Sequence, residues 1–257
     1  MRKPLVLAAL VTIAAWIYTI RGADSMSSGM PMPGGWEMQM AWMAMGGQSR
    51  LAHAAMFIIM WTVMMIAMML PSVMPAVLLH RRLIVSRIER GDTAAGSHLL
   101  LLAGYFAVWA LFGLIVYAIG MSISVAAMRH ERVSLFVPIA TGATLIVAGL
   151  YQLTPWKRLC LRHCRSPLDF FARHQIRTAG DSWRFGLHHG LYCAACCWGL
   201  MAIQLSLGIM SVSLMVLVAV VIFLEKQWRH GEAFATVAGV AAIAGGILLV
   251  LRARIGG

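Results

Sequence analysis

Seven apolar segments, each long enough or nearly long enough to cross a bilayer, constrain this chain more than any other feature. The hydrocarbon core of a membrane is crossed by about 20 helical residues. The segments comprise residues 5–20, 53–79, 98–120, 134–153, 186–207, 209–225 and 233–251. Because 61% of the chain is hydrophobic and only 12% is charged, an ordinary soluble domain is excluded. The sequence therefore predicts an all-α polytopic transmembrane helical bundle of about seven spans, embedded in a lipid bilayer.

The basic residues, which give the chain a net charge of +12, lie in alternate loops. They gather before the first span, in 81–90 after the second and in 157–184 between the fourth and fifth, whereas 22–49 contains no Lys or Arg. Membrane proteins retain Lys and Arg on the cytoplasmic side. This placement predicts a cytoplasmic N-terminus and does not indicate nucleic-acid binding. Arg252 and Arg254 are exceptions, unless one segment after residue 186 is re-entrant.

We interpret residues 1–257 as a single integral membrane domain with two sizeable connections. Residues 21–50 form a Met-rich extracytoplasmic loop with a short interfacial helix around 36–45, and residues 154–185 form a basic cytoplasmic loop. The similarity of MWTVM to CWGLM indicates that spans two to four and five to seven are two three-helix repeats after an N-terminal helix. Such units would run in opposite directions, as in transporters built from inverted repeats. Chance similarity in so apolar a sequence is the alternative.

The fifth span carries a stripe of residues that can bind metals. His189, Cys193, Cys197 and Met201 follow one another at intervals of four, and Cys196 lies on the adjoining face. Residues four apart share one face of a helix. Imidazole, thiolate and thioether groups are ligands that soft metals bind, with Cu(I) first among them. The alternative is that the cysteines pack as small hydrophobic residues and the histidine lies near a helix end. The four residues together favour a metal site.

The second span contains MFIIMWTVMMIAMMLPSVMP, which holds seven of the 20 methionines. Six of them form two helical series, Met56, Met60, Met64 and Met68 beside Met65 and Met69. Leucine is equally apolar, so hydrophobicity alone does not select methionine. A thioether adds a neutral, soft ligand that binds Cu(I) without deprotonation. The alternative is that these methionines fill irregular gaps in the packing.

Three Met-x-Met pairs lie in the loop ahead of this span. They are Met30 with Met32, Met38 with Met40, and Met43 with Met45. Exposed methionines on a loop rich in Gly and Pro have no packing role, so we interpret them as a capture loop for the metal. The alternative is a flap that lies on the membrane.

The basic loop contains KRLCLRHCRS, in which His163 lies between Cys160 and Cys164. A reducing cytosol keeps both cysteines as thiols. These three residues either accept the metal on the cytoplasmic side or have no metal role, and the Cys-x₃-Cys spacing alone favours the second interpretation.

Nothing in the sequence indicates a domain that binds and hydrolyses a nucleotide. It contains no Walker loop, no dinucleotide fingerprint and no His-Glu-x-x-His pair. A metal-moving chain of this kind acts as a passive conduit, couples to other ions or delivers the metal to a partner. Glu225 is one of few acids near an apolar segment. We predict that it forms an interfacial ion pair with Lys226, with a proton-coupled role as the alternative.

The segments MWTVMMIAMMLPSVMP and GLYCAACCWGLMAIQLSLGIM, followed by FLEK, resemble a bacterial membrane-protein family known as domain of unknown function 2182. The resemblance covers most of the chain from about residue 36 onward and implies a polytopic inner-membrane protein that is predicted to bind metal. The defining elements of the family fall here on Trp61, Met64, Met65, Met68, Met69, Pro71 and Ser72, and on Cys193, Cys196, Cys197, Trp198, Met201, Glu225 and Lys226.

These patterns support three hypotheses. The first is a membrane transporter or chaperone of a soft metal, with Cu(I) as the first candidate, that serves a periplasmic or membrane metalloprotein. The second is a thiol–disulfide relay linked to a quinone, because CAAC is a Cys-x-x-Cys motif. The third is an accessory subunit whose methionines pack against a larger membrane complex.

Overall fold

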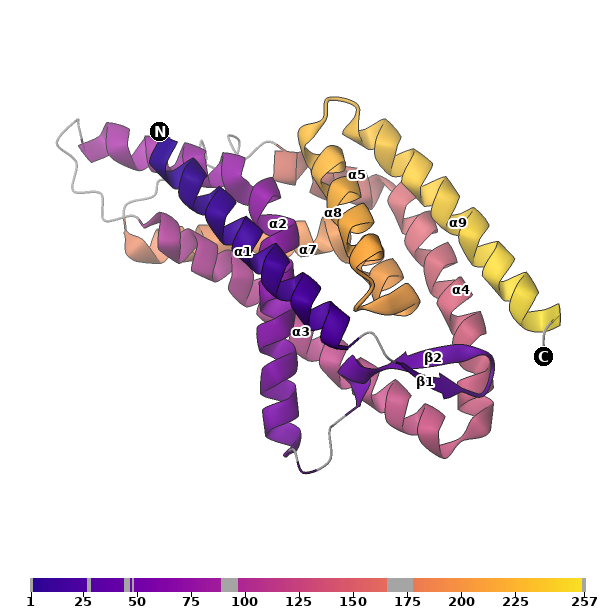
Figure 1. Cartoon of the computed structure of the whole chain (residues 1–257). Helices are drawn as coiled ribbons and strands as arrows, with labels where there is room; N and C mark the ends of the chain where they lie inside the picture. Colours follow the sequence, from indigo (N-terminus) through magenta and orange to yellow (C-terminus); the bar gives the residue numbers. More distant parts are fainter. Residues whose placement is uncertain are drawn as a thin grey trace.

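The computed structural model describes residues 2–26, 29–43, 47, 49–88, 97–165 and 178–255. Its helices are α1 (Arg2–Ser25), α2 (Arg50–Ile88), α3 (His98–Arg129), α4 (Glu131–Leu153), α5 (Pro155–Arg165), α7 (Ala179–Gly208), α8 (Val212–Gln227) and α9 (Gly231–Ile255). A two-stranded hairpin, β1 (Gly29–Met32) and β2 (Trp36–Gln39), lies between α1 and α2 (Figure 1). The predicted all-α helical bundle is confirmed, with this small hairpin as an addition.

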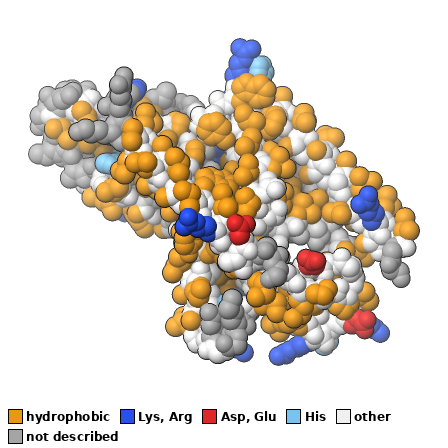
Figure 2. All heavy atoms as spheres, in the orientation of Figure 1, with side chains coloured by type: hydrophobic (Ala, Val, Ile, Leu, Met, Phe, Trp, Pro, Cys, Tyr) orange, Lys and Arg blue, Asp and Glu red, His pale blue; other side chains and the backbone are white. Residues whose placement is uncertain are grey.

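Six of the described helices, α1, α2, α3, α4, α7 and α9, are long and apolar enough to cross a membrane. Figure 2 shows hydrophobic side chains over most of the visible face, with charged side chains in small groups near helix ends and turns. The segment 209–225 was expected to be the sixth of seven spans. It corresponds to α8, which has only 16 residues and is not among these six helices. Gly208, with a φ of 147°, lets the chain reverse after α7, and Ser211 then caps α8.

The hairpin replaces part of the short helix expected around residues 36–45. Residues 36–39 form β2, which pairs with β1 in antiparallel register. Gly34 and Gly35 both have positive φ and make the turn. Two prolines lie just before these glycines in the sequence, where they disfavour a helix. Among the described residues 36–43, the helical part is one 3₁₀ turn, Met40–Trp42.

Glycines allow two pairs of helices to approach closely. On α3 and α7, a Cβ at Gly104 would lie 2.5 Å from the backbone oxygen of Trp183, and one at Gly190 would lie 3.1 Å from the Val108 side chain. Residue numbers rise together along the two helices, so α3 and α7 are parallel. The antiparallel pair α4 and α9, side by side in Figure 1, approaches through Gly142, Gly149, Gly239 and Gly246.

The helix α2 is 39 residues long and contains Pro71 and Pro75. A proline inside a helix removes a hydrogen bond and kinks the helix, and α2 changes direction partway along its length in Figure 1. Helix α1 packs along α2. Helix α8 contacts α2 beside the prolines, where Gln227 Nε2 donates to the backbone oxygen of Ser72 at 3.3 Å.

The basic segment 154–185 contains a short helix in its first part. Helix α5 begins two residues after α4 ends and packs against α7 and α8. It is amphipathic, since Lys157 and Leu161 are buried whereas Trp156 and Leu159 are exposed. The positions that face inward therefore recur every three or four residues, as on any helix that covers a core.

Candidate functional site

The interior face of α7 carries the predicted stripe. Cys193, Cys196, Cys197 and Met201 are each at most 1% exposed, and His189 is buried at 8%. The His189 ring lies 5.9 Å from the ring of Tyr105 on α3, one turn before Cys193. The structure thus places all five predicted residues of the fifth span in the protein interior.

A cysteine from α5 joins those of α7. Cys164 Sγ lies 3.7 Å from Cys196 Sγ, which lies 3.3 Å from Cys197 Sγ. Cys196 Sγ also donates to the backbone oxygen of Cys193 at 3.2 Å. We call Cys164, Cys193, Cys196 and Cys197 the thiol cluster; all are free cysteines. The spacing of Lys157, Leu161 and Cys164 on α5 brings Cys164 to the inward face.

Two groups from other helices bind Cys193. Lys226 Nζ, on α8, donates to Cys193 Sγ at 2.8 Å, and the Tyr105 hydroxyl lies 2.9 Å from the same sulfur. An ammonium group beside a buried sulfur favours the thiolate over the thiol. Lys226 and Tyr105 are 7% and 0% exposed, so water contributes little to this contact.

A buried ion pair lies next to the cluster. Lys157 Nζ is 2.7 Å from Glu225 Oε2, with both side chains at most 1% exposed, and it also donates to the backbone oxygen of Cys196. Gln152 Nε2 donates to Glu225 Oε1 at 2.8 Å. Burial alone would lower the pKa of Lys157, but the negative charge of Glu225 raises it, so Lys157 stays charged.

The predicted pair of Glu225 with Lys226 is therefore wrong. Both residues are buried rather than interfacial. Consecutive helical residues point about 100° apart. Glu225 consequently turns to Lys157 on α5, while Lys226 turns to Cys193 on α7.

The hydrogen bonds and sulfur contacts of the thiol cluster given above do not involve Cys160 or His163. The Cys160 thiol is half-buried, and burial raises its pKa. The His163 ring stacks on Tyr192, with ring centroids 4.4 Å apart, and its side chain is exposed. Of the three residues predicted in the basic loop, the structure brings only Cys164 against another thiol.

The methionines of α2 divide into two groups. Met64, Met65, Met68 and Met69 are at most 2% exposed and belong to the core, whereas Met56 is 59% exposed and Met60 is half-buried. The first four form the Met stretch, a name we keep below. The structure therefore places only the later part of the predicted series inside the bundle.

Two contacts set α2 against α7. His80 Nε2 lies 3.1 Å from Ser182 Oγ, and Gln204 Nε2 donates to Met64 Sδ at 3.6 Å. Residue numbers rise along one helix as they fall along the other, so the two segments are antiparallel. Between these contacts lie Met65, Met68 and Met69 on α2, and Cys193, Cys196, Cys197 and Met201 on α7. The Met stretch and the cysteine face thus share one core.

The predicted capture loop is largely folded against the bundle. Met30 pairs with Met38 across the hairpin, and Met38 is fully buried whereas Met30 is 41% exposed. Met32, Met40 and Met43 are half-buried, and Met45 lies outside the described residues. Trp36 Nε1 donates to the Ser134 backbone oxygen at 3.0 Å and Gln39 Oε1 accepts from the Met210 backbone N–H at 3.3 Å. These bonds hold the hairpin at the end of the bundle opposite α5, over a cavity of about 360 Å³.

Sequence reasoning missed Lys157 and Tyr105 as neighbours of the cysteines. Lys157 is one of many basic residues in its segment, and no local signal separates it from the others. Tyr105 lies in a uniformly apolar span. Two buried methionines, Met210 and Met215, were also missed, because they lie outside the Met-rich stretch.

The thiol cluster offers four cysteine sulfurs as soft donors for a metal ion. Within the described ranges, no group of three or more His, Cys, Asp or Glu side chains is placed to hold a metal ion. A metal–thiolate bond is about 2.3 Å long for zinc, so two sulfurs that share an ion lie at most about 4.6 Å apart. The Cys164–Cys196 and Cys196–Cys197 distances are shorter than that limit, so each pair of sulfurs is close enough to share one ion.

The long apolar helices and the buried thiols define a polytopic helical protein with soft ligands in its interior. The sequence model of the PpoB2 family, described as a copper chaperone, matches residues 58–249, and the chain belongs to this family. The motifs suggested a family under another name, but the expected metal connection agrees with this copper-related one. Neither the curated proteins nor the solved structures gave a match.

Proposed function

We propose that this protein is a membrane carrier of Cu(I), which it holds at the thiol cluster and delivers to a metalloprotein. Its membership of a copper-chaperone family and its six helices of membrane-spanning length support the proposal. Copper is the cargo, and thiolates and thioethers are ligands that Cu(I) prefers.

The contact of Cys164 with Cys196 is the observation that carries the proposal. Two thiols from different helices, the half-buried Cys164 and the buried Cys196, lie 3.7 Å apart, with a third thiol 3.3 Å from Cys196. Cu(I) held by two thiolates has a net charge of −1. A buried anion needs a nearby cation, and Lys226, which bonds to Cys193 of the thiol cluster, supplies it, whereas the charge of Lys157 is paired with Glu225.

We assign the Met stretch to the approach path of the ion. Its thioethers are neutral ligands, so Cu(I) exchanges among them without releasing a proton at each step. Gln204, which donates to Met64 Sδ, lies one turn beyond Met201 on α7 and marks where the path reaches the cysteine helix. The hairpin methionines, with the exposed Met30 first, collect the ion at the other end of the bundle.

We place the protein in a bacterial inner membrane with its N-terminus in the cytoplasm, as the distribution of basic residues predicts. The α5 end of the bundle then faces the cytoplasm, and the hairpin faces the periplasm. The carrier exchanges copper with a periplasmic or membrane metalloprotein and uses no nucleotide.

The test is Cu(I) affinity, measured by competition with a chromophoric chelator under anaerobic, reducing conditions. Cys196→Ser is expected to weaken binding about 100-fold, or about 2.7 kcal/mol, and Cys164→Ser to weaken it in the same direction. Cys160→Ser is the matched control, because Cys160 lies on the same helix but makes no hydrogen bond to a cluster thiol among the described residues. Equal affinity in all four proteins would overturn the proposal.

A second candidate function is thiol–disulfide exchange, and the same 3.7 Å contact favours it by giving Cys196 a partner outside its own helix. Two thiols would form one disulfide, and a quinone would take the two electrons and two protons to become a quinol. Incubation with a soluble quinone followed by peptide mass spectrometry tests this function. A Cys164–Cys196 disulfide formed with equimolar quinol supports it, and two free thiols exclude it.

A further inference from the structure

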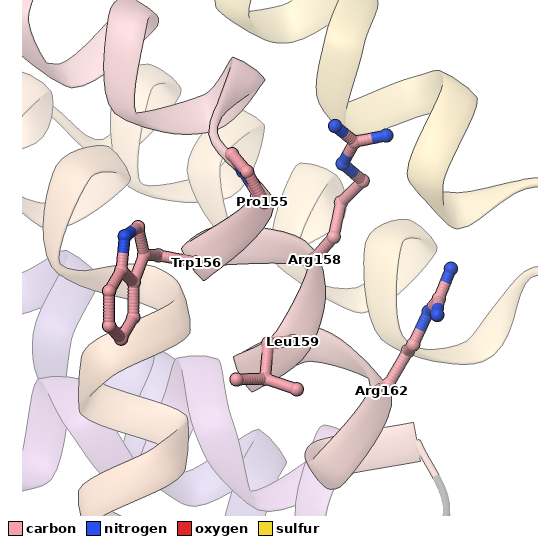
Figure 3. Close-up of a pocket in the computed structure, with 5 residues that line it drawn as sticks. All are labelled: Pro155, Trp156, Arg158, Leu159 and Arg162. Carbon is pink, nitrogen blue, oxygen red and sulfur yellow. The ribbon is translucent and has the colours of Figure 1, made fainter.

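We propose that the outward face of α5 binds the headgroup of an anionic phospholipid and that this contact holds Cys164 in the thiol cluster. The face consists of Pro155, Trp156, Arg158, Leu159 and Arg162, which line a shallow open depression of about 400 Å³ (Figure 3). The first part of the proposal is independent of copper. The second part concerns the position of Cys164, whatever the cluster binds.

The position of α5 places this face at the membrane surface. Helix α4, one of the membrane-spanning candidates, ends at Leu153, and α5 starts at Pro155. Trp156 is 71% exposed and Leu159 is 54% exposed. Tryptophan is enriched at the level of lipid headgroups, where its ring is partly in hydrocarbon and partly in water. An exposed Trp and Leu on a short amphipathic helix are typical of a helix that lies in the interface.

The charges beside these apolar groups select an anion. Figure 3 shows the guanidinium groups of Arg158 and Arg162 on the same side of α5, with Leu159 between Arg162 and Trp156. Arg162 Nε bonds to Glu232 Oε1 at 2.9 Å, whereas the Arg158 guanidinium makes no hydrogen bond or ion pair within the described part of the chain. Two guanidinium groups and one carboxylate leave a net positive charge of one. A planar guanidinium matches the oxygens of a phosphate.

Both faces of α5 are then in use. The outward face contacts lipid, while Lys157, Leu161 and Cys164 on the inward face contact α7 and α8. The helix has only 11 residues, and its segment continues into residues 166–177, outside the described ranges. Short helices are marginal without tertiary contacts. A phospholipid bound to the outward face therefore adds to the contacts that keep Cys164 beside Cys196.

The first experiment measures lipid retention. Protein in nanodiscs of mixed phosphatidylglycerol and phosphatidylcholine is released and analysed by native mass spectrometry. Arg158→Gln is expected to retain about fivefold less phosphatidylglycerol, because one basic residue near a membrane surface contributes this much to anionic-lipid binding. Arg132→Gln, which removes an exposed charge at the opposite end of the bundle, is the matched control and should retain lipid as the wild type does.

Retention unchanged in Arg158→Gln, or reduced equally in Arg132→Gln, would overturn the lipid site. Competition by free glycerol phosphate as strong as that by phosphatidylglycerol would show a soluble phosphate site instead. Arg158 is exposed, so its variant should fold, and thermal unfolding checks this.

The second experiment measures maleimide labelling of Cys164 in a Cys160→Ser background. Replacing phosphatidylglycerol by phosphatidylcholine is expected to speed labelling several-fold, with no such change in the variant that also carries Arg158→Gln. Equal labelling rates in both lipids would overturn the link between lipid and thiol cluster. Copper is absent from both experiments, so a failed Cu(I) affinity test leaves their outcome unaffected.

Discussion

The thiol cluster and the Met stretch lie in one core but are held in different ways. Hydrogen bonds and ion pairs tie the cluster to its surroundings, with Tyr105 from α3 and Lys226 from α8 on Cys193, and Lys157 from α5 beside Cys196. Within the described part of the chain, the Met stretch has one such bond to another helix, from Gln204 to Met64 Sδ. Its remaining buried surface is apolar packing.

This difference follows the chemistry of the two ligands. A thiol must lose a proton to bind a metal strongly, and the resulting charge must be compensated in a buried site. A thioether carries no charge of its own, so apolar packing is sufficient for the Met stretch in the absence of a bound ion. The comparison therefore separates a region suited to holding an ion from a region suited to passing it on.

The largest effect is expected from the ion pair that supports the cluster. Lys157→Met leaves Glu225 buried without its cation, which is expected to cost about 3–5 kcal/mol of folding stability. Thermal unfolding in detergent, followed by circular dichroism, measures the loss.

The double variant Lys157→Met with Glu225→Leu sharpens this result. Removing both charges of a buried pair is often neutral, so the double variant should be more stable than the single one. If both variants unfold at the same temperature, the pair is not the cause of the loss.

A smaller effect is expected from removal of the Lys226 ammonium group, which contacts Cys193. Lys226→Met removes the donor 2.8 Å from the sulfur, so the thiolate loses its cation and Cu(I) affinity should fall about tenfold or more. Chelator competition provides the measurement. Lys226→Arg keeps the charge and should retain more of the affinity than Lys226→Met; the opposite order would argue against charge compensation.

Replacing methionines of the Met stretch should change the rate of Cu(I) transfer more than it changes the stability of the fold. Leucine conserves the volume of methionine, and such exchanges usually cost less than about 1.5 kcal/mol. Met64→Leu with Met68→Leu should therefore leave the unfolding temperature nearly unchanged, while uptake of Cu(I) into the thiol cluster from the hairpin side becomes several-fold slower. Stopped-flow transfer in proteoliposomes measures the rate. An unchanged transfer rate would show that these methionines only pack the core and do not carry the ion.

The smallest effect is expected at Met56, which is 59% exposed. Met56→Leu should change neither stability nor transfer rate within error, and it serves as the control for the double methionine variant. A slower transfer in Met56→Leu would extend the path toward the start of α2.

The sequence was sufficient to predict the bundle and the buried cysteines of α7, whereas only four of the six predicted methionines of α2 are buried. These features depend on local periodicity and composition, which are visible in any single helix. The exposure of Met56 also follows from helix geometry. Four residues turn a helix by about 400°, so each i, i+4 step drifts by about 40°, and Met56 lies about 120° from Met68 around the axis.

The neighbours of the cysteines required the tertiary structure. Whether Cys164 or Cys160 reaches the cluster depends on how α5 rotates against α7, and spacing alone does not set that rotation. The partner of Glu225 depends in the same way on a lysine 68 residues earlier in the chain. The start of α8 was placed three residues too early, because hydropathy does not show that residues 209–211 connect α7 to α8 in a chain reversal.

The anchoring of the hairpin has a consequence for the order of events during synthesis. Trp36 bonds to Ser134, 98 residues further along the chain, and Gln39 bonds to the backbone of Met210, 171 residues further along. Chains emerge from the ribosome N-terminus first, at about 5–20 residues per second. The hairpin methionines thus leave the ribosome early but reach their final arrangement only after α7 has been made. Nascent chains that still lack the thiol cluster therefore also lack a fully anchored hairpin.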